Sequence, residues 1–270
     1  ILVYTNISPD HLDRHGSMEE YINMKLNALT NMKDKGQIVY NKDDSILEEV
    51  LSPSIYKKQP FSTKSKDVLY NIDNENIIGP FDDKILEIGE LGIPGEHNLQ
   101  NFLAASTCSH LMGIPQNQIV RTLKEFKGIE HRLEYVRTIN EVEYINDSKA
   151  TNINSVIVAI NTYDQPIVLI LGGFNKGANF RLLLPHIKSS HVREIVSYGD
   201  AGGQINTALG DAVRSVQVTD LSSAVKKAQL MAAPGDIVLL SPGCASYDEF
   251  SNFEERGNHF KSMIKSIAIS

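Results

Sequence analysis

After Gly128 the hydrophobic residues gather into short, nearly continuous runs, and each run is followed by a polar loop and an amphipathic stretch. The runs at 167–171 and 237–240 contain no polar residue, which is typical of strands buried on both faces of a parallel sheet. We therefore predict a doubly wound parallel α/β domain over 129–270. Its strands are expected at 131–139, 142–146, 167–171, 194–198, 216–218 and 237–240, and its helices at 154–161, 180–187, 203–209, 222–231 and 247–267.

The first part of the chain, 1–128, mixes the periodicities of helices and strands. Residues 1–4 are a run of β-forming side chains with no turn before them, so we expect a strand that is entered midway and a large N-terminal portion upstream of it. Ser17 and Glu20 form a capping-box pattern, in which each side chain satisfies a free backbone N–H at the start of a helix. The elements expected here are a helix at 17–32, a strand at 37–40, a helix at 45–51, a small antiparallel section within 53–92, and helices at 97–112 and 116–126.

Composition narrows the classes of function. The chain has 270 residues, 41% of them hydrophobic, which is enough for two domains with separate cores. It carries 26 Lys and Arg against 33 Asp and Glu, so it offers no basic excess for a nucleic-acid backbone. No apolar run approaches the roughly 20 residues of a membrane span. The two cysteines, Cys108 and Cys244, form no pairing framework, and we expect a cytoplasmic protein.

Three loops of the second domain carry unusual sets of polar residues, and each follows a predicted strand. They are 147–152 (DSKATN), 172–177 (GGFNKG) and 241–250 (SPGCASYDEF). In sheets of this type ligands bind beyond the carboxyl ends of the strands. Two ammonium groups with hydroxyls and a helix N-terminus favour a carboxylate or phosphate ligand. We call this edge of the sheet, with its three loops, the rim. The residues expected to bind the anion there are Lys149, Thr151, Lys176 and Ser246.

Each loop also has a plainer interpretation. Gly172 and Gly173 can be turn residues alone, and Ser246 with Glu249 can be a capping box that starts a helix. A lysine on a loop is usually solvated. We favour the anion site because these residues are expected at one edge of the sheet, whereas a random scatter would place half of them at the other edge.

In the first domain, the loop at 6–15 (NISPDHLDRH) follows a strand and carries two histidines, two aspartates and an arginine. Histidine with carboxylate oxygens suits a divalent ion that works with phosphate; the alternative is a solvated loop with a helix-capping aspartate. His97, Asn98 and Asn101 share one helical face. Because asparagine is a poor helix former, this cluster suggests hydrogen bonds to a ligand, and a structural role for the amides is an equally fair interpretation.

Five motifs, in order and spacing, resemble the Mur ligase family. The resemblance spans essentially the whole chain, and its DSKATN and closing motifs are similar to the branch that adds D-glutamate. It implies the end of a central ATP-binding domain at 1–128, followed by a Rossmann-like C-terminal domain at 129–270 that binds the amino acid. The motifs are the loop at 6–15, GEHNLQNFLAA at 95–105, HRLE at 131–134, DSKATN at 147–152 and LSPGCASYDEF at 240–250.

The resemblance also implies a chemistry, namely ATP-dependent amide-bond formation in peptidoglycan synthesis by a monomer. Its cofactors are ATP and Mg²⁺, and its substrates are UDP-N-acetylmuramoyl-L-alanine and D-glutamate. ATP phosphorylates the substrate carboxylate, and the amino acid attacks the acyl phosphate. The residues carried over by resemblance are His11 and a carbamylated Lys25 for catalysis and magnesium, Asn98, Asn101, Arg132 and Asp147 for the nucleotide, and Lys149, Thr151, Lys176, Ser246 and Phe253 for D-glutamate.

The chain departs from the family pattern in three places. It has no G-x-x-x-x-G-K-[ST] phosphate loop, which family members carry upstream of the 6–15 motif. We therefore expect this chain alone to bind ATP poorly and not to turn over. Gly243 stands where the family usually has alanine, and Asn175 where it usually has aspartate. Two competing hypotheses are a Mur-like ligase of another amino-acid specificity, such as a folylpolyglutamate synthetase relative, and a non-catalytic binding module.

Overall fold

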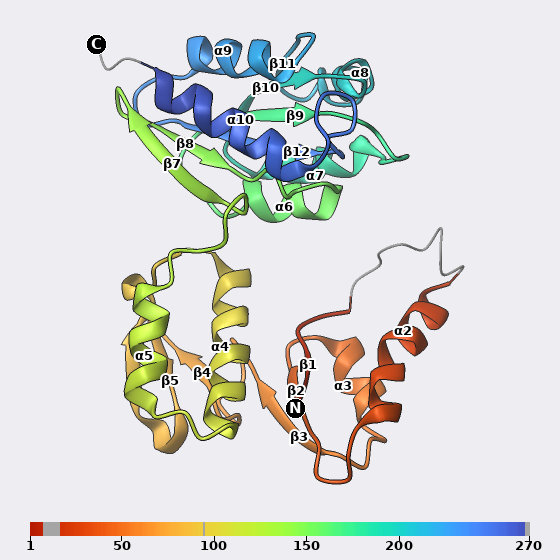
Figure 1. Cartoon of the computed structure of the whole chain (residues 1–270), viewed down its shortest axis with the longest axis vertical. Coiled ribbons are helices and arrows are strands. Elements are labelled where there is room, and N and C mark those ends of the chain that lie inside the picture. The colour runs from red at the N-terminus through yellow and green to blue at the C-terminus, as the bar shows by residue number, and fades with distance from the viewer. Residues whose placement is uncertain (8–16, 94, 268–270) are drawn as a thin grey trace. The chain divides into compact units, whose positions relative to one another are not determined.

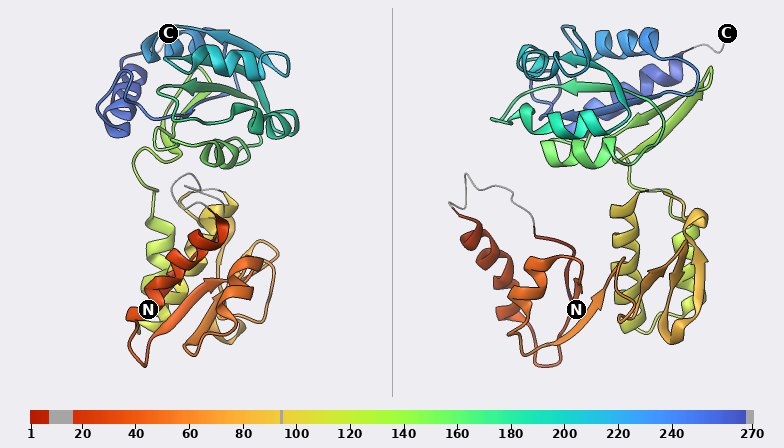
Figure 2. Two further views of the ribbon diagram at one scale, coloured as in Figure 1. Left: turned by 90° about the vertical axis from the view of Figure 1, so that its right-hand side faces the viewer. Right: turned by 180° about the vertical axis from the view of Figure 1, so that it is seen from behind.

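The computed structural model describes residues 1–7, 17–93 and 95–267. The chain divides into two compact units, Ile1–Lys127 (unit 1) and Gly128–Ser270 (unit 2). Each unit has its own sheets, as Figures 1 and 2 show, and its own hydrophobic cores.

Unit 1 is built around a parallel sheet in the order β1-β2-β3. Alternate residues of a strand point to opposite faces, and the central strand uses both: Ile38 and Tyr40 join one core, whereas Val39 joins another. Helices α2 and α3 cover the first face, and α4 and α5 contribute to the second core. The elements are β1 (Leu2–Tyr4), α2 (Met18–Leu26), β2 (Gln37–Asn41), α3 (Ser45–Leu51), β3 (Lys57–Phe61), α4 (Glu96–Leu111) and α5 (Gln116–Glu125).

A second, antiparallel sheet of unit 1 contains β4 (Asn71–Asp73), β5 (Asn76–Ile78) and β6 (Lys84–Glu87). The antiparallel section expected within 53–92 is therefore present. It does not include β3, which pairs parallel with β2, because α3 lies between these strands as a crossover. The helix expected at 17–32 was too long, since α2 ends at Leu26 and a 3₁₀ turn follows at Asn27–Asn31.

Unit 2 contains a six-stranded sheet in the order β11-β10-β9-β12-β8-β7. All neighbours are parallel except β7, which pairs antiparallel with β8 at the edge. The strand predicted from 131 begins only at Glu134, because His131 and Leu133 adopt positive φ angles of 66° and 45°. The strands are β7 (Glu134–Ile139), β8 (Val142–Asn146), β9 (Ile167–Gly172), β10 (Val192–Tyr198), β11 (Arg214–Gln217) and β12 (Ile237–Gly243).

Helices cover both faces of this sheet, so the prediction of a doubly wound α/β domain is confirmed (Figure 1). One face packs against α6 (Ile153–Ile160), α7 (Leu184–Ser189) and α8 (Gly202–Leu209). The other packs against α9 (Leu221–Met231) and α10 (Phe253–Ser266). The fully buried strands β9 and β12 supply residues to both cores.

The last helix starts later than predicted. It begins at Phe253 rather than 247, because the side chain of Asn252 caps it by accepting from the N–H of Glu255. The backbone between Ser246 and Asn252 is a loop, in which the N–H groups of Glu249 and Phe250 donate to the carbonyl of Ser246. Ser246 and Glu249 are therefore not a capping box.

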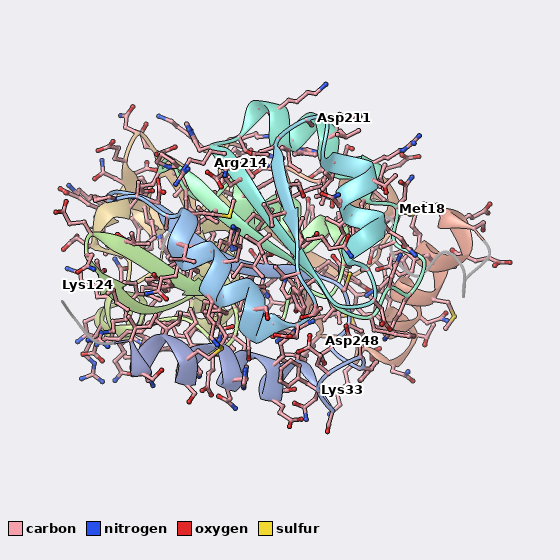
Figure 3. All side chains as sticks on the ribbon, turned by 90° about the horizontal axis from the view of Figure 1, so that it is seen from above. Met18, Lys33, Lys124, Asp211, Arg214 and Asp248 are labelled. Carbon is pink, nitrogen blue, oxygen red and sulfur yellow. The ribbon has the colours of Figure 1, made fainter. Side chains whose placement is uncertain are left out.

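None of the helices in the described part of the chain is long and apolar enough to cross a membrane. Figure 3 draws the described side chains, and nitrogen- and oxygen-tipped groups are interspersed over the face it shows.

Candidate functional site

The strand order of unit 2 brings the three polar loops together. Strand β12 lies between β9 and β8, and all three run parallel, so their carboxyl ends meet at one edge of the sheet. The loops that follow them start at Asp147, Gly173 and Cys244. The structure thus places Lys149, Thr151, Lys176 and Ser246 on loops at the same edge.

Backbone hydrogen bonds join these loops. The N–H of Asp147 donates to the carbonyl of Leu240 at 2.8 Å, and the N–H of Gly243 donates to the carbonyl of Ala150 at 2.9 Å. Phe174 and Ala245 exchange two hydrogen bonds, at 2.9 and 3.1 Å. Gly243 has a φ of 67°, a left-handed conformation that favours glycine. The rim is therefore one hydrogen-bonded surface and not three separate loops.

Two exposed lysines of the rim each stack on an aromatic ring. Lys149 Nζ lies 5.9 Å from the centroid of the Phe253 ring, and Lys176 Nζ lies 4.9 Å from that of Tyr247. Such cation–π contacts hold an ammonium group without neutralising its charge. Tyr247 was not predicted as a site residue, and its position next to Ser246 is the one sequence feature that could have identified it. Thr151 is exposed and Ser246 is buried.

The loop that carries Lys176 is held by its neighbour Asn175. The side-chain carbonyl of Asn175 accepts from the N–H groups of Gly177 and Ala178 at 2.9 and 2.7 Å. Its amide donates to Oε1 of Gln204 at 2.6 Å. Asn175 therefore shapes the turn after β9 while placing no negative charge beside Lys176.

Asp147 lies at the base of the rim, almost fully buried. One carboxylate oxygen accepts from the N–H of Leu133 at 3.2 Å, and the other accepts from the hydroxyl of Ser241 at 2.8 Å. Burial raises the pKa of Asp147 to about 7, against the lowering effects of these two hydrogen bonds and of Arg132. Each oxygen keeps one lone pair for a further donor. Arg132 itself is exposed.

His131 is a site residue that the sequence did not identify, although it stands next to Arg132. It is 4% exposed, its ring meets Phe253 edge-on, and its carbonyl accepts from the N–H of Lys149 at 3.0 Å. Burial, and next the charge of Lys261, lower the pKa of His131. The backbone carbonyl of His131 thus supports the backbone of Lys149, and its imidazole packs against the Phe253 ring.

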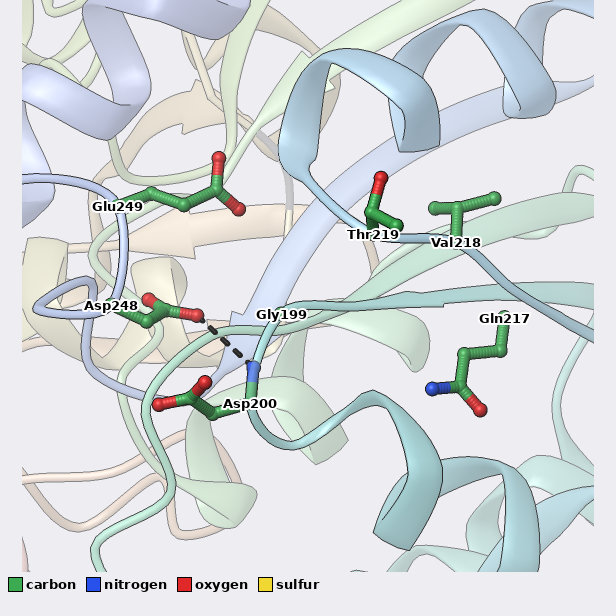
Figure 4. A pocket seen from close by; sticks show the side chains of 7 residues that line it. All are labelled: Gly199, Asp200, Gln217, Val218, Thr219, Asp248 and Glu249. Atoms are coloured by element: carbon green, nitrogen blue, oxygen red, sulfur yellow. Dashed lines mark hydrogen bonds between the residues drawn. The ribbon is translucent and has the colours of Figure 1, made fainter.

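A pocket of about 550 Å³ lies at the ends of β10 and β11, and the 241–250 loop of the rim contributes Asp248 and Glu249 to its lining. Its charged side chains are carboxylates, namely Asp200, Asp248 and Glu249 (Figure 4). Asp248 accepts from the N–H of Asp200 at 3.3 Å. An acidic lining repels anions, so a carboxylate or phosphate ligand fits the lysine rim and not this pocket.

Only some of the candidate residues of unit 1 lie in the part of the chain that the structure describes. His11 lies outside the described residues. Lys25 is exposed on α2, with Nζ 5.3 Å from the centroid of the Tyr21 ring. Asn98 is buried and Asn101 is exposed, both in the first half of α4. These two belong to unit 1, and Arg132 and Asp147 belong to unit 2.

Within the described residues, no group of three or more His, Cys, Asp or Glu side chains could hold a metal ion. The donors around Lys25 are therefore insufficient by themselves to define a magnesium site. Both cysteines are free thiols. Burial raises the pKa of Cys244 to about 12, so this thiol is not a nucleophile at neutral pH.

Two family models match the chain. The Mur ligase middle domain matches residues 1–109, and the Mur ligase, glutamate ligase domain matches residues 131–244. The second match covers the loops after β8 and β9. Ser246 and Phe253 lie beyond it.

Curated relatives match over nearly the whole chain. The UDP-N-acetylmuramoylalanine–D-glutamate ligase of Natranaerobius thermophilus is 41% identical over 269 residues, which is 97% of this chain and 58% of that protein. The ligase of the same name from Clostridioides difficile is 40% identical over 267 residues, covering 97% of this chain and 59% of that protein. The chain thus spans less than two thirds of the length of these relatives.

Solved structures show the same fold at low identity. MurF from Acinetobacter baumannii aligns with a TM-score of 0.73 and 15% identity, covering 98% of this chain and 59% of that one. MurC from Thermotoga maritima aligns with a TM-score of 0.69 and 16% identity, again covering 98% of this chain and 59% of that one.

Proposed function

Because the chain belongs to the Mur ligase family, we propose that it is the central and C-terminal part of an ATP-dependent ligase that joins D-glutamate to UDP-N-acetylmuramoyl-L-alanine. Unit 1 would contribute to the ATP site, and unit 2 would bind the amino acid. The names of the curated relatives support this specificity. The free thiols Cys108 and Cys244 are consistent with work in a reducing cytoplasm.

The observation that carries the proposal is the pair of stacked lysines at the carboxyl edge of the unit 2 sheet. D-Glutamate has two carboxylates and one amine. In our proposal the ammonium groups of Lys149 and Lys176 bind the carboxylates as charge-assisted donors. Thr151 and Ser246 add hydroxyls, and the Phe253 ring supports the Lys149 side chain.

The proposed chemistry is transfer of the γ-phosphoryl group of ATP to the substrate carboxylate. The amine of D-glutamate then attacks the acyl carbon, the amide bond forms, and inorganic phosphate leaves with its electron pair while the amine loses a proton. Binding by the two carboxylates would leave the amine of D-glutamate free to react. Positioning of this kind supplies much of the rate acceleration when two substrates react.

For the nucleotide we propose Asn98, Asn101, Arg132 and Asp147. Asp147 has a free lone pair on each oxygen and Arg132 is exposed, which suits hydrogen bonds to ribose hydroxyls and to adenine. His11 and Lys25, the latter as its carbamate, remain the proposed magnesium ligands. The described residues do not by themselves complete a site for the metal.

The test is phosphate release by the full-length protein with ATP, magnesium and UDP-N-acetylmuramoyl-L-alanine. Release should depend on D-glutamate, and L-glutamate should replace it poorly. Equal activity with L-glutamate would favour a ligase of another specificity, and no release with either isomer would favour a binding module.

A further inference from the structure

Arg256 is a completely buried cation in the first turns of α10. The ion pairs among the described residues of unit 2 involve Arg193, Arg214, Lys261 and His131, but not Arg256. Burying a charge without a carboxylate partner costs free energy. A buried charge is therefore stable only where hydrogen bonds within the protein replace those it made to water. The partners of this guanidinium therefore indicate its role.

All of these partners belong to two of the rim loops. Nε donates to the hydroxyl of Ser148 at 2.9 Å, and Nη2 donates to the carbonyls of Ser148 and Cys244 at 2.8 and 3.0 Å. Nη1 donates to the carbonyl of Ala245 at 3.1 Å. One side chain thus joins the loop after β8 to the loop after β12.

The start of α10 and the loop after β9 also lie next to Arg256 or its partner Ser148. The hydroxyl of Ser148 donates to the carbonyl of Phe253 at 2.8 Å. In the loop after β9, a Cβ on Gly173 would lie 2.4 Å from the carbonyl oxygen of Ala245 and 3.0 Å from Nη1 of Arg256. Only a residue without a side chain allows this close approach.

Two of the residues bound by Arg256 directly precede a proposed amino-acid contact, because Ser148 precedes Lys149 and Ala245 precedes Ser246. Phe253, a third proposed contact, is linked to Arg256 through the hydroxyl of Ser148. We propose that Arg256 is a positioning residue for the amino-acid site, fixing the backbone from which Lys149, Ser246 and Phe253 project. This inference rests on the proposed function of the rim.

The charge of Arg256 has a second effect at the same place. Its guanidinium lies behind the loops that carry Lys149 and Ser246, in a region from which water is excluded. Low surrounding polarity strengthens the field of a charge. Arg256 therefore adds to the positive potential that Lys149 and Lys176 present to a ligand with two carboxylates.

The test compares Arg256→Gln and Arg256→Lys with the wild type in the full-length protein, using phosphate release. Arg256→Gln should raise the KM for D-glutamate about tenfold, equivalent to about 1.4 kcal/mol of binding, because the backbone that carries Lys149, Ser246 and Phe253 loses its support, and it should leave the KM values for ATP and the nucleotide substrate unchanged. Arg256→Lys keeps the charge and should recover part of the loss. Phe260→Leu, a core change in the same helix, is the control that lowers the Tm without changing the KM for D-glutamate.

The outcomes separate this inference from the proposed function. An unchanged KM for D-glutamate in folded Arg256→Gln, or a parallel change in all three KM values, would overturn the positioning role. Should Arg256 variants not fold, Ser148→Ala removes the acceptor of Nε and decides by the same criterion, with a several-fold rise expected. A wild-type enzyme that ligates no D-glutamate would overturn the proposed function instead.

Discussion

The side-chain amide of Asn146 donates to Nδ1 of His131 at 3.0 Å. The orientation of this amide is fixed, because its oxygen accepts from the N–H of Ser148 and its nitrogen also donates to Glu134. Nδ1 is therefore an acceptor, and the proton of the neutral imidazole is on Nε2. A buried amide thus sets the tautomer of a histidine that lies under the rim.

This relationship predicts a loss of stability in acid. The pKa of His131 in the folded chain is lowered, whereas in the unfolded chain it is about 6.5. The unfolded state therefore binds the proton first, so this contribution is complete above about pH 6.5 and is lost as the pH falls. Urea unfolding of the chain at about pH 7.5 and 5.5 measures the loss. His131→Asn places an oxygen at the position of Nδ1 and should show a smaller loss; equal losses would contradict the assignment.

Asp147 predicts the opposite dependence. Its pKa is raised to about 7 by burial, from about 3.9 in the unfolded chain. Stability from this group is therefore present below about pH 4 and is lost by about 1.4 kcal/mol per pH unit as the pH rises toward 7. Asp147→Asn keeps the shape and cannot ionise, so its advantage over the wild type should grow from pH 4 to 7 and then level off. An advantage that does not vary with pH in urea unfolding would refute the raised pKa.

The imidazole of His131 leaves no room for a side chain at position 257 of α10, which is Gly257. A Cβ at this position would lie 2.2 Å from Nδ1 of His131. Gly257→Ala should lower the free energy of unfolding by about 1–3 kcal/mol, the usual cost of overpacking. The matched control is Gly203→Ala in α8, where the nearest atom is 3.8 Å away, and this change should be stabilising by about 0.4–1 kcal/mol. Guanidinium unfolding of both variants distinguishes steric exclusion from a general effect of alanine, since equal shifts would count against the contact.

Tyr247 predicts a graded effect on the amino-acid site. Its ring stacks under Lys176 Nζ, and an exposed cation–π contact contributes about 0.5–1 kcal/mol. Tyr247→Leu should therefore raise the KM for D-glutamate about two- to fivefold. Tyr247→Phe keeps the ring and should match the wild type. Equal KM values for Tyr247→Leu and Tyr247→Phe would show that the ring does not position the lysine.

The architecture of unit 2 could be predicted because its strands are so strongly patterned. The fully apolar runs at β9 and β12 indicated burial on both faces, and the structure confirms this. The start of α10 was missed because the 246–252 loop and the helix share a polar composition, and only the side chain of Asn252 marks the boundary. The strand β7 was predicted, but its antiparallel direction was not, because alternation alone does not give strand direction.

The lysine loops of the candidate site could be located from the rule that ligands bind at the carboxyl ends of strands. Their supports could not. His131 and Arg256 are identified only by long-range contacts, such as the hydrogen bonds between Arg256 and Ser148, 108 positions apart. Composition and periodicity do not distinguish a buried arginine from an exposed one, so the burial of Arg256 could not be predicted from the sequence.

The most direct test of the account is the KM for D-glutamate of Lys176→Gln in the full-length protein. Lys188→Gln is the matched control, because Lys188 is an exposed lysine on α7. If the rim binds the amino acid, Lys176→Gln should raise this KM by at least about tenfold, the effect of removing a charge-assisted contact to a carboxylate, and Lys188→Gln should leave it unchanged. A KM for D-glutamate that is the same in both variants and in the wild type would contradict the assignment of the amino-acid site to this edge of the sheet.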